Sequence, residues 1–182
     1  MLYELEFYNS PTGEVMFTGE NGTSPLRSGD RAVVTELLDT IRDCYADAYA
    51  ALSQLYSKSA SNRPYMEFRI VSRFIRCNCG NFDTQRTDYQ DGIFALEQVP
   101  CPLRGCHECP LEGVVCNPKR TAVLTARQME VALLLADGYS SQDVANKLVI
   151  SINTVRVLVA QIKSRLGVTH THQIIHFINS LH

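Results

Sequence analysis

Residues 124–168 read LTARQMEVALLLADGYSSQDVANKLVISINTVRVLVAQIKSRLGV, and their apolar side chains recur at the three- and four-residue spacing of amphipathic helices. Polar residues of the kind that cap helices interrupt this pattern at short intervals. The segment therefore predicts three short helices joined by tight turns. Their expected boundaries are a cap at Thr125, a stop at Asp137-Gly138, a capping pair of Ser140 with Asp143, a cap at Ser151 and a stop at Gly167.

A fourth helix is expected after this segment, over residues 171–181. Its apolar side chains fall on one face and are Ile174, Ile175, Ile178 and Leu181. The third helix has a similar stripe, made of Val155, Val159, Ile162 and Leu166. Four short helices with turns this tight predict an all-α helix-turn-helix domain over residues 122–182.

Several short pieces of this region recur, with the same spacing and without gaps, in a known family. They are Leu124-Thr125, Arg127, Glu130-Val131, Leu135-Ala136, Gly138, Ser140, Val144-Ala145, Leu148, Ile150-Ser151, Asn153-Thr154-Val155, Ile162 and Leu166-Gly167-Val168. On these residues the region resembles the LuxR-type (also called GerE- or FixJ-type) DNA-binding domain. The resemblance implies a sequence-specific transcriptional regulator whose third helix enters the major groove of double-stranded DNA.

The resemblance also implies roles for individual residues of the third helix. Three of them would face the bases, namely Arg156, Val157 and Ala160. Three more would lie nearer the DNA backbone, namely Gln161, Lys163 and Ser164. The chemistry of the helix start agrees, because Ser151, Asn153 and Thr154 surround free N–H groups that suit phosphate contact. An arginine such as Arg156 can pair with guanine O6 and N7, which discriminates by about 1–3 kcal/mol.

Charge is distributed unevenly along the chain. Residues 1–118 carry ten Lys/Arg and sixteen Asp/Glu, a net charge of −6, whereas residues 119–182 carry seven and three, a net charge of +4. This split favours contact between the C-terminal part and a polyanion.

A different class of function is compatible with the same helices. Leu158 stands where the family usually has His, Ala160 where a long polar residue is common, and Gln128 where Glu is frequent. The alternative is therefore a degenerate helix-turn-helix that does not bind DNA and instead docks another protein through Val157, Leu158 and Ala160.

The N-terminal part predicts an α+β domain over residues 1–100. Period-2 alternation indicates strands over residues 2–8 and 14–19, joined by the turn Ser10-Pro11-Thr12-Gly13. Helical spacing indicates one long amphipathic helix, or two abutting ones, over residues 28–57, with Cys44 as a buried small hydrophobe. Further strands are expected over residues 65–77 and 93–100.

The helix over 28–57 is a candidate homodimer surface, because one recognition helix buries too little area for tight specific DNA binding.

Six cysteines gather between these two parts, in a Cys-rich segment over residues 101–118 together with Cys77 and Cys79. Those of the segment are Cys101, Cys106, Cys109 and Cys116. Thiolates at such spacings suit tetrahedral zinc, and glycines and prolines between them suit the turns that aim ligands at one point. Cysteine-only ligation also suits an iron–sulfur cluster, which would make the protein a redox-sensing or iron–sulfur regulator. Free or buried thiols are the third reading, and His107 is a further candidate ligand.

The Cys-rich segment resembles that of small LuxR-type regulators in which RCN, CPLRG and a final Cys-x-Pro-Lys precede the DNA-binding domain. This resemblance implies that the metal ligands are Cys77, Cys101, Cys109 and Cys116, with Cys79 and Cys106 as extras. Alternatively, Cys106 takes the place of Cys109, because the chain carries two additional residues here relative to that pattern.

Other functions find no support in the sequence. The chain lacks G-x-G-x-x-G, a P-loop and H-E-x-x-H, so we expect no enzyme of those classes and no catalytic residue. No run approaches the roughly 18 apolar residues of a membrane span, and the start of the chain is unlike a signal peptide. We therefore expect a cytoplasmic protein without membrane contact, in which reducing conditions disfavour disulfides.

Overall fold

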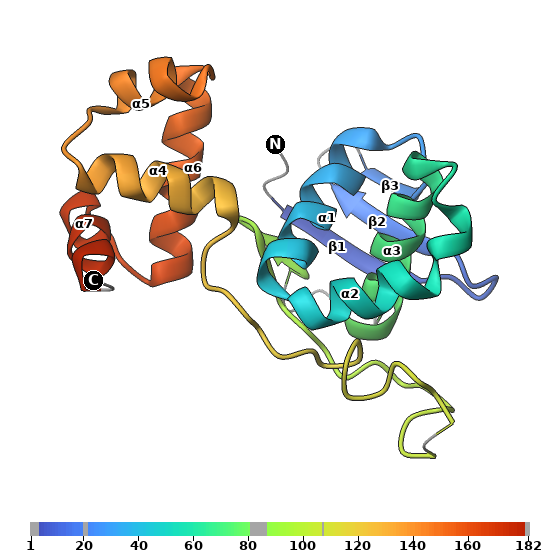
Figure 1. Cartoon of the computed structure of the whole chain (residues 1–182). Coiled ribbons are helices and arrows are strands. Elements are labelled where there is room, and N and C mark those ends of the chain that lie inside the picture. Colours follow the sequence, from blue (N-terminus) through green and yellow to red (C-terminus); the bar gives the residue numbers. More distant parts are fainter. Residues whose placement is uncertain (1–3, 20–21, 81–86, 107, 181–182) are drawn as a thin grey trace. The chain divides into compact units, whose positions relative to one another are not determined.

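The computed structural model describes residues 4–19, 22–80, 87–106 and 108–180. The chain divides into two compact units, Met1–Thr121 and Ala122–His182. The first unit combines an antiparallel sheet with helices, and the second contains only helices among its described residues (Figure 1). The predicted combination of an α+β region with an all-α C-terminal domain is confirmed.

The sheet of the first unit has the strand order β3-β2-β1-β4-β5, and every neighbouring pair is antiparallel. Its strands are β1 (Glu4–Asn9), β2 (Val15–Gly19), β3 (Gly22–Pro25), β4 (Tyr89–Gln90) and β5 (Ile93–Phe94). The predicted hairpin is confirmed, because β1 and β2 pair with Phe7 opposite Phe17, across a turn in which Gly13 has φ 81°. The predicted strand over 93–100 is reduced to β5. Edge strand β3 was not predicted, because its glycine and proline resemble a turn.

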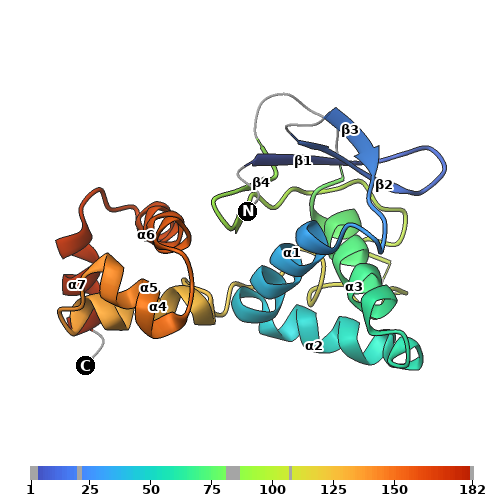
Figure 2. The ribbon, with the colours of Figure 1, turned by 90° about the horizontal axis from the view of Figure 1, so that it is seen from above.

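Three α-helices of the first unit, α1 (Arg31–Cys44), α2 (Ala46–Leu55) and α3 (Arg63–Asn78), lie on one face of the sheet (Figure 2). A short 3-10 turn, η1 (Ser57–Ser59), follows α2. The predicted helix over 28–57 is therefore two abutting helices, which meet at Tyr45, where φ is −138°.

The predicted strand over 65–77 is wrong, because these residues lie within helix α3. The Asn62 side chain caps this helix by accepting a hydrogen bond from the Tyr65 N–H, and Pro64 occupies its first turn. The apolar side chains that α3 buries are Ile70, Val71, Phe74 and Ile75, and their positions follow helical spacing. The short alternation of Met66, Phe68 and Ile70 is thus part of a helical pattern.

One apolar core joins the sheet, the helices and the Cys-rich segment of the first unit. Phe74 contacts Phe94 and Tyr45 at ring-centroid distances of 5.1 and 5.3 Å, and Cys44 is fully buried as predicted. Leu111 and Val115 belong to the same core. The Cys-rich segment therefore packs as part of the first unit, although the described residues between Phe94 and Ala126 form neither helix nor strand.

The second unit consists of α4 (Ala126–Ala136), α5 (Ser141–Leu148), α6 (Ile152–Leu166) and α7 (Thr171–Asn179). The predicted caps are confirmed: the side chains of Thr125, Ser140 and Ser151 each accept a backbone N–H bond three residues on, and Gly167 ends α6 with φ 67°. A single core holds the four helices together, with Val131, Val144, Val155, Ile162 and Ile174 among its buried members. Leu181, expected in the last helix, lies outside the described residues.

Candidate nucleic-acid interface and cysteine cluster

Helices α5 and α6 are joined by a short, tight turn. Val149 follows α5 in the left-handed conformation, with φ 55°, and its side chain is 90% exposed. Ser151 then caps α6, with its Oγ 3.0 Å from the Thr154 N–H. Arg127 of α4 donates a hydrogen bond to the carbonyl of Leu148, the last residue of α5, at 3.2 Å and so holds the end of α5. The arrangement is a helix-turn-helix, whose second helix has a defined start.

One face of α6 is open to solvent and carries polar side chains. Its exposed members are Asn153, Arg156, Ala160 and Ser164, which are three or four residues apart and therefore lie on one stripe. Thr154, Val157 and Lys163 flank this stripe and are partly exposed. We call these seven residues the α6 face.

Arg156 is the arginine of the α6 face and is more exposed than Lys163, the other cation of that face. Its only hydrogen bond within the described residues is a 3.4 Å contact from Nη1 to Asn153 Oδ1, and no carboxylate there pairs with it. Most of its guanidinium donors are consequently available to an external acceptor.

Two residues that the sequence analysis placed on this face are buried instead. Gln161 is 6% exposed, and its Oε1 accepts a 3.2 Å hydrogen bond from Gln128 Nε2 of α4. Leu158 is 7% exposed and packs in the core, so it does not contribute to an exposed apolar surface.

The pairing of Gln128 with Gln161 was not anticipated from the sequence. Gln128 also closes the capping box of α4, because its Oε1 accepts the Thr125 N–H at 3.1 Å. One buried amide thus joins the start of α4 to the middle of α6.

Lys147 on α5 is a second candidate cation that the sequence analysis did not single out. It is exposed, its Nζ lies 4.1 Å from the centroid of the Tyr139 ring, and it is 3.0 Å from the Tyr139 hydroxyl. The cue in the sequence was its position at the end of the helix before the turn.

Apart from the buried Cys44, the cysteines of the first unit separate into three groups. Cys116 and Cys109 both lie close enough to Cys77 to raise the pKa of its thiol. Cys79 is fully buried elsewhere, with Asp88, Glu97 and Glu6 as its acidic neighbours. Cys101 and Cys106 are exposed, and His107 lies outside the described residues.

Burial and neighbouring groups determine the pKa of two thiols, Cys77 in α3 and Cys79 just after it. Burial first, and then the neighbouring Cys116, raises the pKa of Cys77 to about 12, against the opposing effect of Arg73. Burial, followed by the charge of Asp88, raises the pKa of Cys79 well above its ordinary value. Both side chains are therefore neutral thiols at pH 7 when no metal is bound.

Asn78, next to Cys77, positions the end of the Cys-rich segment. Its side chain is fully buried, donates to the Val115 carbonyl at 2.8 Å and accepts the Asn117 N–H at 2.8 Å. These bonds bring Cys116 to the end of α3, where Cys77 lies.

The described residues contain no group of three or more His, Cys, Asp or Glu arranged to hold a metal ion. The turns around the cysteines are nevertheless tight. The carbonyl of Cys101 accepts the Arg104 N–H and that of Cys109 accepts the Glu112 N–H, each at 3.1 Å. Gly105 and Gly113 follow with φ 80° and 76°.

Comparison with known proteins places the second unit in a family. Residues 122–178 match the family described as bacterial regulatory proteins, luxR family. Curated relatives include the response regulator protein VraR of Staphylococcus aureus (strain Mu3 / ATCC 700698) and of Staphylococcus epidermidis (strain ATCC 35984 / DSM 28319 / BCRC 17069 / CCUG 31568 / BM 3577 / RP62A), each 48% identical over 46 residues.

That similarity covers 25% of this chain and 22% of each relative, so the chain spans about a fifth of the length of these curated relatives. No solved structure matches the chain significantly. No described helix has both the length and the apolar character needed to cross a membrane. Residues 122–178 form a helix-turn-helix domain of the luxR family of bacterial regulatory proteins.

Proposed function

We propose that this protein is a transcriptional regulator that binds double-stranded DNA by placing α6 in the major groove. The observation that carries the proposal is the α6 face, a solvent-exposed polar stripe on the second helix of a luxR-family helix-turn-helix domain. The net charge of +4 on residues 119–182, from seven Lys/Arg and three Asp/Glu, favours the same partner.

The exposed positions suggest a division of roles along α6. Arg156 reads a base edge, with guanine as its best partner, while Val157 and Ala160 offer apolar contacts of the kind that thymine methyl groups accept. Ser151, Asn153 and Thr154 sit at the capped start of the helix, where backbone N–H groups favour a phosphate. Lys163 and Ser164 contact the DNA backbone further along, and Lys147 of α5 adds a contact before the turn.

Gln161 is left out of this contacting set because its amide is buried and hydrogen-bonded to Gln128. It acts by positioning α6 against α4. The alternative function, docking of another protein, would need an apolar surface made of Val157, Leu158 and Ala160. Leu158 is buried in the core, so only Val157 and Ala160 remain at the surface. The exposed surface of α6 therefore favours DNA over an apolar protein partner.

Selection of bound duplexes from a random-sequence pool by the full chain tests the proposal. A DNA-reading α6 yields an enriched sequence, and Arg156→Ala relaxes the preference at one position. Arg63→Ala removes an exposed arginine of the first unit that lies on α3, outside α1 and α2, and serves as the charge-matched control. A folded chain that enriches no sequence and retains no duplex contradicts the proposal and favours the adaptor function.

We further propose that the protein acts as a homodimer. A single recognition helix reads few base pairs, and two-fold pairing is the usual way in which helix-turn-helix proteins double the contact. The α1–α2 surface is the candidate interface. Light scattering of the full chain, with and without duplex, measures the mass, and a monomer on DNA contradicts this part.

We also propose a structural zinc ion bound by Cys77, Cys109, Cys116 and the exposed Cys101, with Cys79 and Cys106 outside the ligand set. The support is that Cys116 and Cys109 both lie near Cys77, and that Cys101 and Cys109 each begin a tight turn. When bound, zinc would convert these thiols to thiolates and fix a segment that lacks helix and strand.

Metal analysis of protein purified without oxygen tests the zinc site. About one zinc per chain is expected, with loss in Cys116→Ser and in the exposed-position variant Cys101→Ser. Cys44→Ser, at a cysteine buried in the core beside α2, is the control and retains the metal. If the protein instead contains iron and absorbs at about 400 nm, the site holds an iron–sulfur cluster and not zinc. A folded chain without metal contradicts both.

A further inference from the structure

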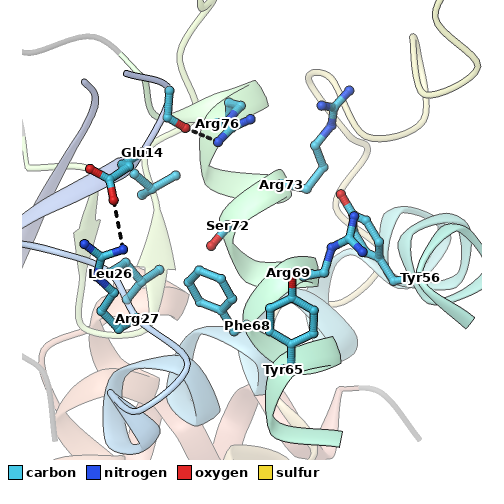
Figure 3. Close-up of a pocket in the computed structure, with 12 residues that line it drawn as sticks. Glu14, Leu26, Arg27, Tyr56, Tyr65, Phe68, Arg69, Ser72, Arg73 and Arg76 are labelled. Carbon is cyan, nitrogen blue, oxygen red and sulfur yellow. Dashed lines mark hydrogen bonds and ion pairs between the residues drawn. The ribbon is translucent and has the colours of Figure 1, made fainter. Parts of the chain in front are cut away.

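A cavity of about 250 Å³ opens on the first unit beside helix α3, and none of its lining residues is a cysteine. Figure 3 shows its wall, to which α3 contributes most of the labelled side chains and the β1–β2 turn and the end of α2 contribute others. Arg69, Arg73 and Arg76 are four and three residues apart, so one face of α3 presents three arginines to this space.

The lining is strongly basic. Four arginines and one carboxylate, Glu14, line the cavity, which leaves a formal charge of +3 at neutral pH. Two of the arginines already have partners: Arg27 pairs with Glu14 at 2.8 Å, and Arg76 donates to the Gly13 carbonyl. Within the part of the chain that the structure describes, no carboxylate pairs with Arg69 or Arg73.

Arg69 is held in place by aromatic rings. Its guanidinium carbon lies 4.2 Å from the centroid of the Tyr56 ring and 5.8 Å from that of Tyr65 (Figure 3). A guanidinium over a ring face is fixed by its flat surface and keeps the N–H donors of its edge free. The ring contact therefore orients a cation without using its hydrogen bonds.

Two buried polar atoms in the cavity wall lack a partner. The Nε of Arg73 and the Oγ of Ser72 are buried, and neither has a hydrogen-bond partner within the described residues. A buried donor without an acceptor costs free energy, so an acceptor that reaches the Arg73 guanidinium would be stabilising.

We propose that this cavity binds a small organic anion whose carboxylate or phosphate group is held by Arg69 and Arg73. Arginine forks match both groups bidentately. The rings of Tyr65 and Phe68 supply an apolar wall for the body of the ligand. The volume lies just below the roughly 300–1,000 Å³ of pockets for drug-sized molecules, so the ligand is small. The proposal stands independently of DNA binding.

Isothermal titration calorimetry on the full chain tests the site with three probes: inorganic phosphate, phenyl phosphate and benzoate. The expected result is that an aromatic anion binds more tightly than inorganic phosphate, because only it contacts the ring wall. The preference between phenyl phosphate and benzoate tells which anionic group the site prefers. Failure of all three to bind the folded protein would overturn the proposal.

Substitutions of the lining arginines test whether the anion binds in this cavity. Arg73→Gln and Arg69→Gln should each weaken binding by about 10- to 100-fold, which corresponds to one lost charge-assisted hydrogen bond. Arg73→Lys keeps the charge but not the fork and should weaken binding less. Arg63→Gln removes an exposed arginine of the same helix that does not line the cavity, and affinity should stay the same. Equal affinity in all variants would show that the anion binds elsewhere.

Discussion

The two units of this protein are organised by interactions of very different sequence range. In the second unit, each of the three caps at Thr125, Ser140 and Ser151 joins residues only three apart. In the first unit, the decisive bonds are long-range. The Phe7 N–H donates to Asp88 over 81 residues, and Asn78 holds Val115 and Asn117 over 37 and 39 residues.

This difference explains which features a sequence reveals. A cap and the helix after it lie within one turn, so residue types and spacing are enough to place them. A bond between α3 and a segment nearly forty residues later depends on the whole fold. We therefore expect the two units to differ also in how they respond to substitution.

The largest effect is expected at the aromatic centre of the first unit. Phe74→Ala removes a fully buried ring that contacts Tyr45 and Phe94, and should lower the free energy of unfolding of this unit by about 3–5 kcal/mol. Scanning calorimetry should show the loss in one transition only. Ile162→Ala in the core of the second unit is the reciprocal control. If either substitution lowers both transitions equally, the units do not unfold separately.

A smaller loss of stability is expected when the long-range hydrogen bonds of Asn78 to the Cys-rich segment are removed. Asn78→Ala leaves the Val115 carbonyl and the Asn117 N–H without their partner, at about 2–3 kcal/mol. Thiol labelling of Cys116 should accelerate, because the segment detaches before the unit unfolds. The exposed Asn146→Ala serves for comparison and should change neither quantity. Unchanged labelling in Asn78→Ala would mean that the core residues alone hold the segment.

On the DNA-binding side, Arg156→Ala should weaken binding to the selected duplex by about 10- to 100-fold, or about 1–3 kcal/mol. Arg156 is exposed and bonded only to Asn153 among the described residues, so stability of the second unit should stay unchanged. Fluorescence anisotropy measures the first quantity and calorimetry the second. Equal affinity of both proteins would remove Arg156 from the base-reading set.

The smallest effect is expected from a local cap. Ser151→Ala removes the acceptor of the Thr154 N–H and should destabilise the second unit by about 1 kcal/mol. Ser151→Asn keeps a capping acceptor and should restore the stability. A loss as large as that of Ile162→Ala would show that the start of α6 depends on more than its local cap.

The sequence predicted the second unit far better than the first. Thr125, Ser140, Ser151 and Gly167 mark helix boundaries where they were expected, because each works through its own neighbours. Gln161 and Leu158 were misplaced, because spacing along α6 does not tell which residues α4 covers.

The misassignment of residues 65–77 also hid the cavity of the first unit. In a strand, Arg76 would point away from Arg69 and Arg73, whereas in helix α3 all three line one space. The proximity of Cys77 to Cys116 agrees with the ligand set that the resemblance to small LuxR-type regulators implied. Its geometry depends on Asn78, whose two long-range bonds leave no local signal.

The most direct test of the central claim is the salt dependence of duplex binding by the full chain. We expect the logarithm of the affinity for double-stranded DNA to fall steeply and linearly with the logarithm of the salt concentration, because phosphate contacts release counterions. Lys163→Ala should reduce the slope by about 1 and leave any sequence preference intact. Affinity that does not change with salt, or no duplex binding by the folded protein at low salt, would contradict the account.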